Sequence, residues 1–388
     1  MKAVTASIVH EDAYTAGRQT AIELMARLGP SLDVVLVFAT SRHAPERVLE
    51  GLWNRLPQRV RLLGCSSFAE IGDDAALSGS VTAMGIDMDG VEWQLFKADT
   101  VGDSSLEAGR SFGELLRGFA ANLVLILSDG MAVNTAKFIR PLQEILGPEC
   151  TVIGGVASEQ FEFTRTFEFF DRQVLQGGVV ALAMKGPIKV ATAARAGFQP
   201  VGVERTCTRV EDDRLILELD GVSALGLYRD FLGPQITDRP SIGTEFPLAL
   251  VVETGGDYMA SDERRQVIRV VRQLDEERGA LLCGSDVPEG SRVRMTRATK
   301  RDIITAASLA VEEVKRALPA AKIGFIFNCA GRRLVLGARY NEEIRAVYDA
   351  LDPDLPTIGF YTYGEISPVD GTVMFHGETF TLALIEAP

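Results

Sequence analysis

The chain has 388 residues, which is more than one ordinary domain needs and comfortable for two. Hydrophobic residues make up 46% and charged residues 24%, so we expect a folded globular protein rather than a disordered one. The 40 Lys and Arg against 53 Asp and Glu give a net charge of −13, which repels phosphate backbones and argues against nucleic-acid binding.

Other features of the composition point to the cytoplasm. The five cysteines are scattered without a CxxC motif, which favours buried free thiols in a reducing compartment over disulfides. No basic-then-apolar leader opens the sequence, and no run of 18 apolar residues predicts a membrane span. We therefore expect a cytoplasmic protein without a membrane-spanning segment.

Residues 1–98 predict strands alternating with helices. In chain order we expect a strand at 4–9, a helix at 13–28, a buried strand at 33–40, a helix at 48–56, a strand at 59–63, a glycine loop at 64–71 and a hairpin of 80–87 with 91–98. The continuous apolar run at 33–40 is typical of a strand that is buried on both faces.

The same order of elements then begins again. We expect a helix at 105–119, a strand at 122–127, a helix at 135–146, a strand at 150–153, a glycine loop at 154–159 and a hairpin of 174–184 with 188–194. Residues 195–213 resemble a crossover because they contain several Gly and Pro residues and a run of acids. We place the domain boundary there, which predicts domains at 1–200 and 201–388.

The order of elements occurs a third time near the C-terminus. We expect a helix at 300–318, a strand at 322–328, an insertion at 329–340, a helix at 341–351, a strand at 355–358, a glycine loop at 359–366 and a paired edge of 373–375 with 379–385. The predicted fold class is therefore α/β: two domains of mixed sheets flanked by helices, built from repeated strand-helix-strand-hairpin units.

The glycine loops are the candidate ligand sites, because ligands of α/β sheets bind beyond the carboxyl ends of strands. The predicted ligand-binding residues are polar groups of the first and third loops, together with one strand-end amide: Cys65, Ser66, Ser67, Glu70, Tyr361, Tyr363, Glu365 and Asn328. A carboxylate among hydroxyls suits a ligand that bears an ammonium or amide group. The alternative is that both Glu residues cap a turn or pair with Arg, and that Asn328 only forms a turn. The middle loop lacks this pattern, so we expect it to be structural.

Catalytic motifs are scarce in this sequence. No GxSxG, HExxH or P-loop pattern occurs, and the three histidines have no metal-ligand spacing. Cys65 lies between a glycine and two serines, a position where a helix N-terminus can activate a thiolate. No candidate base is adjacent, so we expect a buried or ligand-lining thiol, and no enzyme.

The chain resembles the FIST family (F-box and intracellular signal transduction proteins) in its bacterial sensory form. The resemblance is carried in the N-terminal half by Leu63 to Ser67 with Glu70-Ile71, Val124 to Gly130, Ile153 to Gly155, Gly177 to Leu182 and Gly197 to Gly202, and in the C-terminal half by Asp220-Gly221, Tyr228, Gly359 to Ile366, Phe375 to Thr379 and Thr381 to Leu384. The chain departs from the family pattern at Phe68-Ala69 and at Gly377.

This resemblance implies an intracellular sensor of a small ligand, for which amino acids have been proposed. No output module is present, so the signal is expected to pass to a separate protein. Some stand-alone members resemble haem proteins that sense nitric oxide and work with a histidine kinase. That alternative needs an axial ligand, for which His376 is the first candidate, against the reading of a satisfied histidine near a strand end. A thiol- or carboxylate-dependent enzyme acting through Cys65 or Glu365 is the third alternative.

Overall fold

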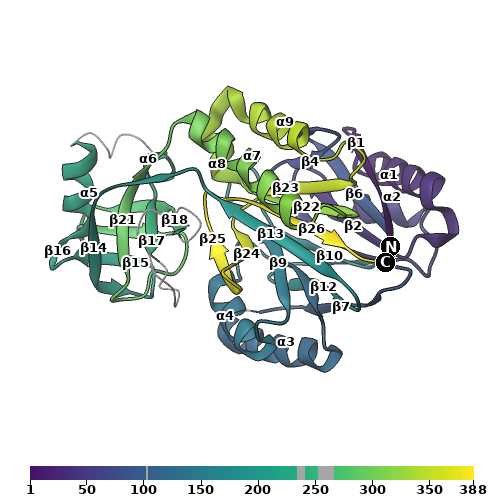
Figure 1. Ribbon diagram of the computed structural model, residues 1–388, viewed down its shortest axis with the longest axis horizontal. Coiled ribbons are helices and arrows are strands. Elements are labelled where there is room, and N and C mark those ends of the chain that lie inside the picture. The colour runs from purple at the N-terminus through teal and green to yellow at the C-terminus, as the bar shows by residue number, and fades with distance from the viewer. Residues whose placement is uncertain (102–103, 234–240, 252–265) are drawn as a thin grey trace.

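The structure is a computed structural model that describes residues 1–101, 104–233, 241–251 and 266–388. Figure 1 shows a large part that holds both chain termini and a smaller part at the opposite end of the molecule. We call the large part the body. We call the smaller part, formed by the described residues between 199 and 297, the inserted domain, because it interrupts the third repeat of the body.

The first repeat of the body alternates strands and helices and ends in three antiparallel strands. It consists of β1 (Lys2–Val9), α1 (Ala13–Leu28), β2 (Val34–Thr40), α2 (Pro45–Trp53), β3 (Arg61–Ser67), β4 (Glu70–Gly72), β5 (Ala75–Leu77) and β6 (Ser80–Asp87). Local sequence sets where the first helix begins, since the Asp12 side chain accepts a hydrogen bond from the Thr15 N–H at 2.7 Å.

The second repeat has the same order of elements. It consists of β7 (Glu92–Ala98), α3 (Ser105–Phe119), β8 (Leu123–Ser128), α4 (Thr135–Leu146), β9 (Thr151–Val156), β10 (Glu168–Phe170), β11 (Gln173–Leu175) and β12 (Val179–Lys185). Its loop between β9 and β10 is longer than the corresponding loop of the first repeat and runs from residue 157 to residue 167.

The third repeat is split by the inserted domain. It consists of β13 (Lys189–Arg195) before the insertion, and after it α7 (Lys300–Ala317), β22 (Ile323–Cys329), α8 (Ala330–Leu336), α9 (Tyr340–Ala350), β23 (Thr357–Thr362), β24 (Glu365–Val369), β25 (Thr372–His376) and β26 (Phe380–Glu386). A capping box between Thr299 and Asp302 starts α7 immediately after the chain returns to the body.

The three repeats form three six-stranded sheets by exchanging their hairpins in a cycle. The sheet orders are β1-β6-β2-β3-β10-β11, β7-β12-β8-β9-β24-β25 and β13-β26-β22-β23-β4-β5. Each sheet therefore takes four strands from one repeat and its last two strands from another. The central pairs β2–β3, β8–β9 and β22–β23 are parallel, and the other pairs are antiparallel.

The core of the body lies where the three sheets face one another. One cluster joins buried side chains of all three sheets, and the Phe38 and Phe360 ring centroids are 4.4 Å apart across it. The helices cover the outer faces, with α1 and α2 on the first sheet, α3 and α4 on the second, and α7 and α9 on the third. Burying apolar surface on both faces of each sheet supplies the main driving force for this part of the fold.

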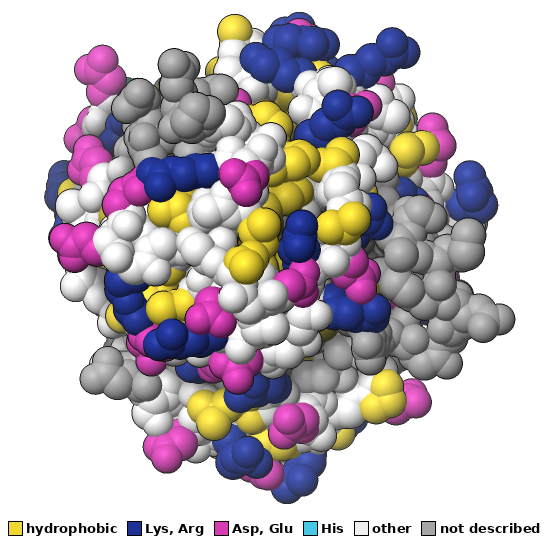
Figure 2. All heavy atoms as spheres, turned by 90° about the vertical axis from the view of Figure 1, so that its left-hand side faces the viewer, with side chains coloured by type: hydrophobic (Ala, Val, Ile, Leu, Met, Phe, Trp, Pro, Cys, Tyr) yellow, Lys and Arg dark blue, Asp and Glu magenta, His cyan; other side chains and the backbone are white. Residues whose placement is uncertain are grey.

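The inserted domain is mostly antiparallel sheet. It consists of β14 (Gln199–Glu211), β15 (Leu215–Leu219), β16 (Val222–Ser223), α5 (Ala224–Leu232), α6 (Ile242–Glu245), β17 (Leu248–Val251), β18 (Gln266–Arg269), β19 (Val271–Asp275), β20 (Ala280–Cys283) and β21 (Arg292–Arg297). The chain enters and leaves through neighbouring strands, since Gln199 of β14 pairs with Arg297 of β21. Figure 2 shows its far end, where apolar side chains lie among charged ones. Val203 and Phe231 line a hollow of about 380 Å³ among its residues.

The predicted α/β class is confirmed, with mixed sheets flanked by helices and a unit that occurs three times. The predicted hairpins are wrong: β6 pairs with β1 and β2, β7 pairs with β12, and β13 pairs with β26. The same holds for the predicted edge of 373–375 with 379–385, because β25 pairs with β24 and β26 with β13 and β22. Consecutive strands pass from one sheet to the next, and their apolar patterns are the same whichever partner they have.

The predicted crossover at 195–213 is also wrong, because most of it is the long strand β14. The sequence of β14 resembles that of a linker, because it contains glycine and because one side of the strand faces solvent and carries exposed residues. The division into 1–200 and 201–388 stays a prediction. In the structure, strands of both halves share two of the three sheets of the body, and the first sheet takes all its strands from residues 1–200.

Candidate functional site

The three glycine loops meet at one place in the body. The predicted loops begin inside the second strand of each parallel pair, since Gly64, Gly154 and Gly359 belong to β3, β9 and β23, and their later residues lie at the carboxyl ends of these strands. Backbone hydrogen bonds join them: Tyr361 N–H to Ala69 O at 2.8 Å, Tyr363 N–H to Val156 O at 3.1 Å, and Ser158 N–H to Ser66 O at 3.2 Å. The three loops are therefore in direct contact.

Two of the predicted glutamates occupy equivalent buried positions. Glu70 and Glu365 are each the first residue of an exchanged hairpin and are fully buried. Glu70 accepts hydrogen bonds from the hydroxyls of Ser67 and Ser80. Glu365 accepts from the Thr362 hydroxyl at 2.5 Å and from the Thr379 N–H at 3.3 Å. Burial raises the pKa of Glu70 to about 7 and that of Glu365 to about 8.

The middle repeat has the same glutamate, which sequence reasoning missed. Glu168 is the first residue of β10 and pairs with Cys65 in the register in which Glu70 pairs with Phe360 and Glu365 with Gly155. Neither carboxyl oxygen of Glu168 has a hydrogen-bond partner among the described residues. Burial raises its pKa well above the usual value. The β9–β10 loop is longer than the loops of the other two repeats, so Glu168 lies nine positions after Glu159 in the sequence. The spacing of the repeated motif therefore did not reveal Glu168.

The remaining predicted residues of the first loop are engaged inside the body. Cys65, Ser66 and Ser67 are fully buried. The Ser66 hydroxyl accepts from the Phe167 N–H at 3.2 Å, and Ser67 donates to Glu70. Burial raises the pKa of the Cys65 thiol, with Glu168 and Glu70 adding to the effect. Cys65 is therefore held as a neutral thiol, which is the opposite of what a nucleophile needs.

A cleft of about 750 Å³ separates the body from the inserted domain. Its lining comes from both parts. The body contributes Gly130, Met131, Val133, Asn134, Thr135, Ala136, Val156, Phe161, Phe163, Cys329, Gly331, Leu334, Thr362, Tyr363, Phe375, Gly377 and Glu378, and the inserted domain contributes Arg214, Ser241, Thr244, Ile268, Val270, Val271, Arg272, Gln273, Leu282, Cys283, Gly284 and Ser285. This volume suits a small organic ligand.

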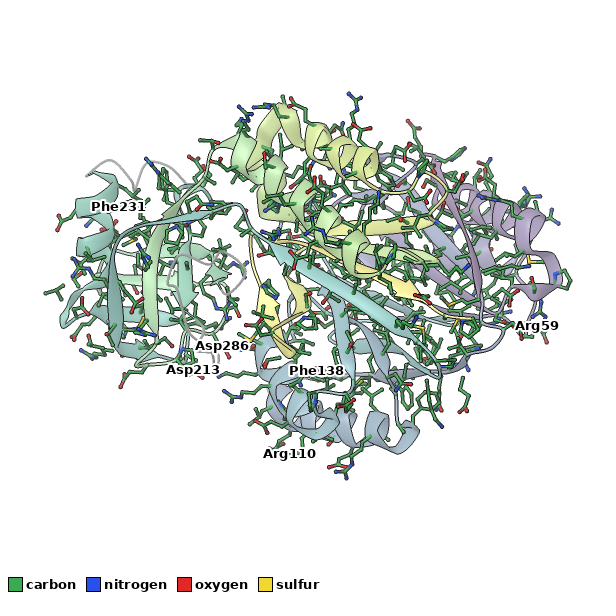
Figure 3. The ribbon with its side chains drawn as sticks, in the orientation of Figure 1. Arg59, Arg110, Phe138, Asp213, Phe231 and Asp286 are labelled. Atoms are coloured by element: carbon green, nitrogen blue, oxygen red, sulfur yellow. The ribbon has the colours of Figure 1, made fainter. Side chains whose placement is uncertain are left out.

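Contacts across the cleft hold the inserted domain against the body. Lys137 Nζ lies 3.1 Å from Asp213 Oδ2, and Asn134 Nδ2 donates to Asp286 Oδ1 at 3.3 Å. Figure 3 shows Asp213 and Asp286 at the edge of the inserted domain that faces α4, the helix of Phe138. On the side of β25, the Arg269 guanidinium donates to Phe375 O at 3.0 Å.

Among the predicted ligand-binding residues, Tyr363 lines this cleft. Its ring stacks on Phe163 with centroids 5.5 Å apart and lies 5.6 Å from the Phe161 centroid. Its hydroxyl donates to the buried Glu159 carboxylate. Tyr361 points the other way, into the core between the third sheet and its helices, where its hydroxyl has no partner among the described residues.

The β9–β10 loop carries the aromatic wall of the cleft, at residues just after the predicted middle loop of 154–159. Phe161 and Phe163 have φ values of 62° and 52°, which non-glycine residues rarely adopt. The Glu159 carboxylate compensates by accepting from the Glu162 and Phe163 N–H groups, each at 2.9 Å. A strained backbone held by a buried acid is typical of a functional loop. In the sequence, the two Phe residues at alternate positions could have indicated this aromatic wall.

Asn328 belongs to a buried ion-pair network and not to the cleft. Its Nδ2 donates to Glu343 at 2.8 Å, and Arg332 Nε donates to the same carboxylate at 3.0 Å. Arg332 and Glu343 have no exposed surface. Further donation from Arg332 to the carbonyl oxygens of Ile303 and Glu378, each at 3.0 Å, ties α7, α8 and the β25–β26 loop together. This network stabilises the floor beneath the cleft.

The predicted axial haem ligand does not line the cleft. His376 lies inside the body, outside the lining of the cleft, with Nε2 3.0 Å from Ser367 O. Burial lowers its pKa to about 4, and the Arg269 cation adds to this effect. In the part of the chain that the structure describes, no three His, Cys, Asp or Glu side chains are grouped as metal ligands.

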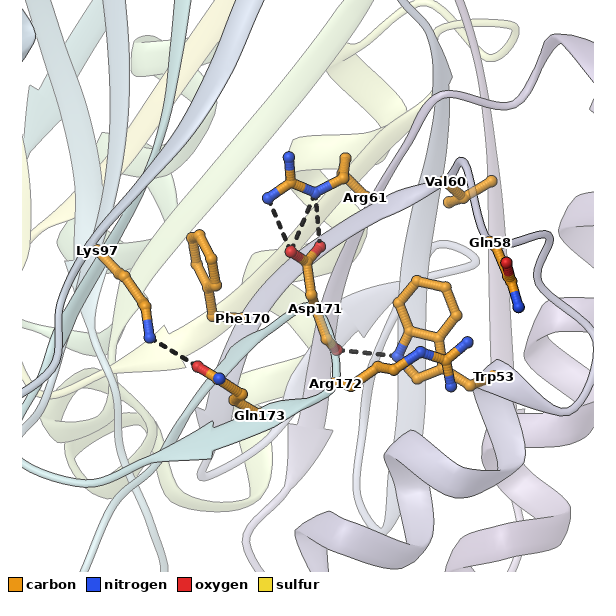
Figure 4. A pocket seen from close by; sticks show the side chains of 9 residues that line it. All are labelled: Trp53, Gln58, Val60, Arg61, Lys97, Phe170, Asp171, Arg172 and Gln173. Atoms are coloured by element: carbon orange, nitrogen blue, oxygen red, sulfur yellow. Dashed lines mark hydrogen bonds and ion pairs between the residues drawn. The ribbon is translucent and has the colours of Figure 1, made fainter.

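A smaller hollow of about 350 Å³ lies on the outer side of the body (Figure 4). Arg172 stacks over the Trp53 ring at 4.3 Å, and Asp171 accepts from Arg61 Nε at 2.9 Å. The Trp53 indole N–H donates to Asp171 O at 2.9 Å. These polar groups are bonded to one another, so we interpret the hollow as a junction between α2 and the β10–β11 hairpin.

None of the helices in the described residues has both the length and the apolar character needed to span a membrane.

Similar proteins of unknown role include one from Mycobacterium tuberculosis, 29% identical over 70% of this chain and 71% of its own length. Another, from Mycobacterium bovis, is 26% identical over 95% of both chains. A crystal structure of cyanuric acid hydrolase from A. caulinodans covers 100% of this chain and 99% of its own at 10% identity. Its TM-score is 0.29, which establishes neither fold nor activity.

Family models describe most of the chain. The FIST N domain matches residues 33–222, and the FIST C domain matches residues 224–368. These domains are associated with signal transduction and the sensing of small ligands. The two matches follow each other along one chain in the order that the sequence motifs predicted, and the chain therefore belongs to the FIST family.

Proposed function

We propose that this protein is a small-ligand sensor that binds its ligand in the cleft between the body and the inserted domain and signals through a separate partner. The observation that carries the proposal is the cleft itself, which has a volume of about 750 Å³ and walls from both parts. A ligand that contacts both walls favours one relative position of the two parts. Occupancy is thereby converted into a change of shape.

The glycine loops keep a role in this proposal. Tyr363 is part of the aromatic wall of the cleft. Glu365 acts through Thr362, which lines the cleft and donates a hydrogen bond from its hydroxyl to the Glu365 carboxylate. Cys65, Ser66, Ser67, Glu70, Tyr361 and Asn328 act as the rigid support that fixes the loops. The chemistry expected of this set is binding, because burial raises the pKa values of the Cys65 and Cys329 thiols, so neither supplies a reactive thiolate at pH 7.

The test is a thermal-shift screen of a metabolite collection, amino acids included, followed by calorimetry on each hit. Phe163→Ala removes an aromatic side chain that is 48% exposed in the cleft. Phe231→Ala is the matched control, because Phe231 is 41% exposed on the far side of the inserted domain. We expect hits whose affinity falls about tenfold or more in Phe163→Ala and is unchanged in Phe231→Ala. Hits that bind Phe163→Ala and Tyr363→Ala as tightly as the wild type would place the site elsewhere.

A further inference from the structure

The charge of the cleft differs from that of the protein as a whole. The chain carries a net charge of −13, yet the inserted-domain wall presents Arg214 and Arg272 to the cleft. Within the described residues neither guanidinium has a carboxylate partner. Arg272 is lined up with the aromatic wall, since its guanidinium lies 4.7 Å from the centroid of Phe163. Two arginines without a carboxylate partner in the described part of the chain, beside an aromatic surface, attract a negatively charged group.

The acids near the cleft do not cancel this charge. Glu378 is fully buried, and burial raises its pKa well above the usual value, which favours its uncharged form. Although Glu378 is part of the lining, both of its carboxyl oxygens are buried, and Oε1 lies against Gly331. Asp213 is paired with Lys137. Asp286 accepts from Asn134, and burial raises its pKa.

Neutral donors lie at the same end of the cleft as the contacts to Asp286. The hydroxyl of Ser285 is buried, lines the cleft and has no hydrogen-bond partner among the described residues. The first turn of α4, a helix of 12 residues, lines it as well through Thr135 and Ala136. Helix N-termini carry amide N–H groups without intrahelical partners and a partial positive charge. A buried, unpaired hydroxyl next to such a terminus is suited to an oxyanion.

We propose that the ligand of the cleft is a small anion with a flat apolar body, whose carboxylate or phosphate lies between Arg272 and Ser285 and whose body stacks on Phe163 and Tyr363. This inference rests on the proposed function and specifies the ligand class for that site. It also assigns the recognition of charge to the inserted domain and the recognition of shape to the body. A ligand with a free ammonium group is disfavoured, because Glu378 is the one acid in the described lining of the cleft and both of its carboxyl oxygens are buried.

The test uses four probes that share one ring system: 2-naphthoate, 2-naphthyl phosphate, 2-naphthalenemethanol and 2-naphthalenemethylamine. Affinities for the full chain are measured at pH 7 by ligand-observed NMR. We expect one or both anions to bind about tenfold or more tighter than the alcohol, and the amine to bind most weakly. The difference between the two anions distinguishes a carboxylate ligand from a phosphate ligand.

Variants then locate the charge recognition. Arg272→Ala should weaken the favoured anion about tenfold and leave the alcohol unchanged. Arg209→Ala is the matched control, because Arg209 is an exposed arginine on β14 that does not line the cleft. Ser285→Ala should weaken the anion by a smaller factor, with no effect on the alcohol. Unchanged melting temperatures show that each variant is folded.

Two outcomes would overturn the inference. One is equal binding of all four probes, or none, in a protein for which the metabolite screen finds ligands that depend on Phe163; the proposed function then stands without this ligand class. The other is a loss of affinity in Arg272→Ala that is the same for the anions and the alcohol. Failure of the proposed function itself is a different result, in which no ligand depends on Phe163.

Discussion

Glu70 accepts two hydrogen bonds from one residue, the hydroxyl of Ser80 at 2.6 Å and the backbone N–H of Ser80 at 3.1 Å. Glu70 begins the hairpin that the first repeat gives to the third sheet, and Ser80 begins the strand that returns to the first sheet. The contact fastens the exchanged hairpin at its base. Glu365 and the Thr379 N–H repeat this contact in the third repeat.

The first prediction concerns the pH dependence of stability. Burial raises the pKa of Glu70 to about 7 and of Glu365 to about 8, from 4.5 in the unfolded chain. The folded state therefore holds these protons more tightly, so their contribution is fully present below about pH 4.5 and is lost as the pH rises through 7 and 8. Urea unfolding should show stability falling across that interval, by up to about 3 kcal/mol for Glu70 alone.

Glu70→Gln tests this assignment, because the amide keeps the shape and cannot ionise. The variant should have a flatter stability profile than the wild type between about pH 5 and pH 8. Glu50→Gln, at an exposed glutamate of α2, is the control and should follow the wild type. Parallel profiles for the wild type and Glu70→Gln would contradict the role given to this carboxyl.

The second prediction concerns three equivalent glycines. A Cβ atom would lie 1.9 Å from Val37 O at Gly64, 1.9 Å from Ile126 O at Gly154 and 2.1 Å from Ile326 O at Gly359. In each case the obstructing carbonyl belongs to the register partner on the parallel strand. Alanine at any one of them should therefore destabilise the fold by about 1–3 kcal/mol or more.

Gly118→Ala is the control for this series. Gly118 lies on α3, and a Cβ there meets no atom within 4 Å, so the substitution should be neutral or slightly stabilising. Chemical denaturation of all four variants is the measurement. A Gly359→Ala protein as stable as Gly118→Ala would show that the parallel strands can separate without cost, contrary to the packing described.

The periodicity of apolar residues predicts which segments are buried helices and strands, but it does not predict which strands pair with one another. Apolar spacing predicted the buried strands and the helices of the three repeats except α8, which lies in the predicted insertion at 329–340, because these patterns report burial directly. It could not predict strand partners, since β6 and β7 are only four residues apart and have apolar stretches that suit either arrangement. Which strand exchanges into which sheet is decided by the whole assembly of three repeats.

The candidate site was predictable in part for the same reason. The repeated motif located the loops and Tyr363, which are positions within one repeat. The cleft depends on Arg272, Ser285 and Phe163, which come from the inserted domain and from a loop that is longer in the second repeat than in the other two. No motif connects them in the sequence, because folding alone brings them to one cavity.

The third prediction concerns the buried pair of Arg332 and Glu343. Neither side chain has exposed surface, and Glu343 also accepts from Asn328. Arg332→Met leaves an uncompensated carboxylate in the core and should cost about 3–5 kcal/mol of unfolding free energy. The double variant Arg332→Met with Glu343→Leu should recover a large part of this loss, since it removes the stranded charge.

Arg339→Met is the matched control for the buried pair. Arg339 pairs with Glu342 at the surface with a separation of 2.7 Å, and both side chains are about half exposed. Solvent screens such pairs, so the urea midpoint should stay close to that of the wild type. A double variant as unstable as Arg332→Met alone would show that the network acts through shape and not through charge.

The last prediction concerns the contact between Lys137 and Asp213 at the rim of the cleft. This ion pair of 3.1 Å joins α4 of the body to the inserted domain. Lys137→Glu replaces the attraction by repulsion and should shift the population toward a more open cleft by a few-fold, because the pair is partly exposed. The helix itself should not suffer, since a glutamate in the first turn interacts favourably with the helix dipole. Small-angle scattering should report a larger radius of gyration, and a cleft ligand should dissociate faster.

Lys137→Glu combined with Asp213→Asn removes the repulsion and should return both values toward those of the wild type. Asparagine is chosen because Asp213 has a φ of 57°, which asparagine tolerates. If the single and double variants dissociate the ligand at the same rate as the wild type, this rim contact does not control the opening of the cleft.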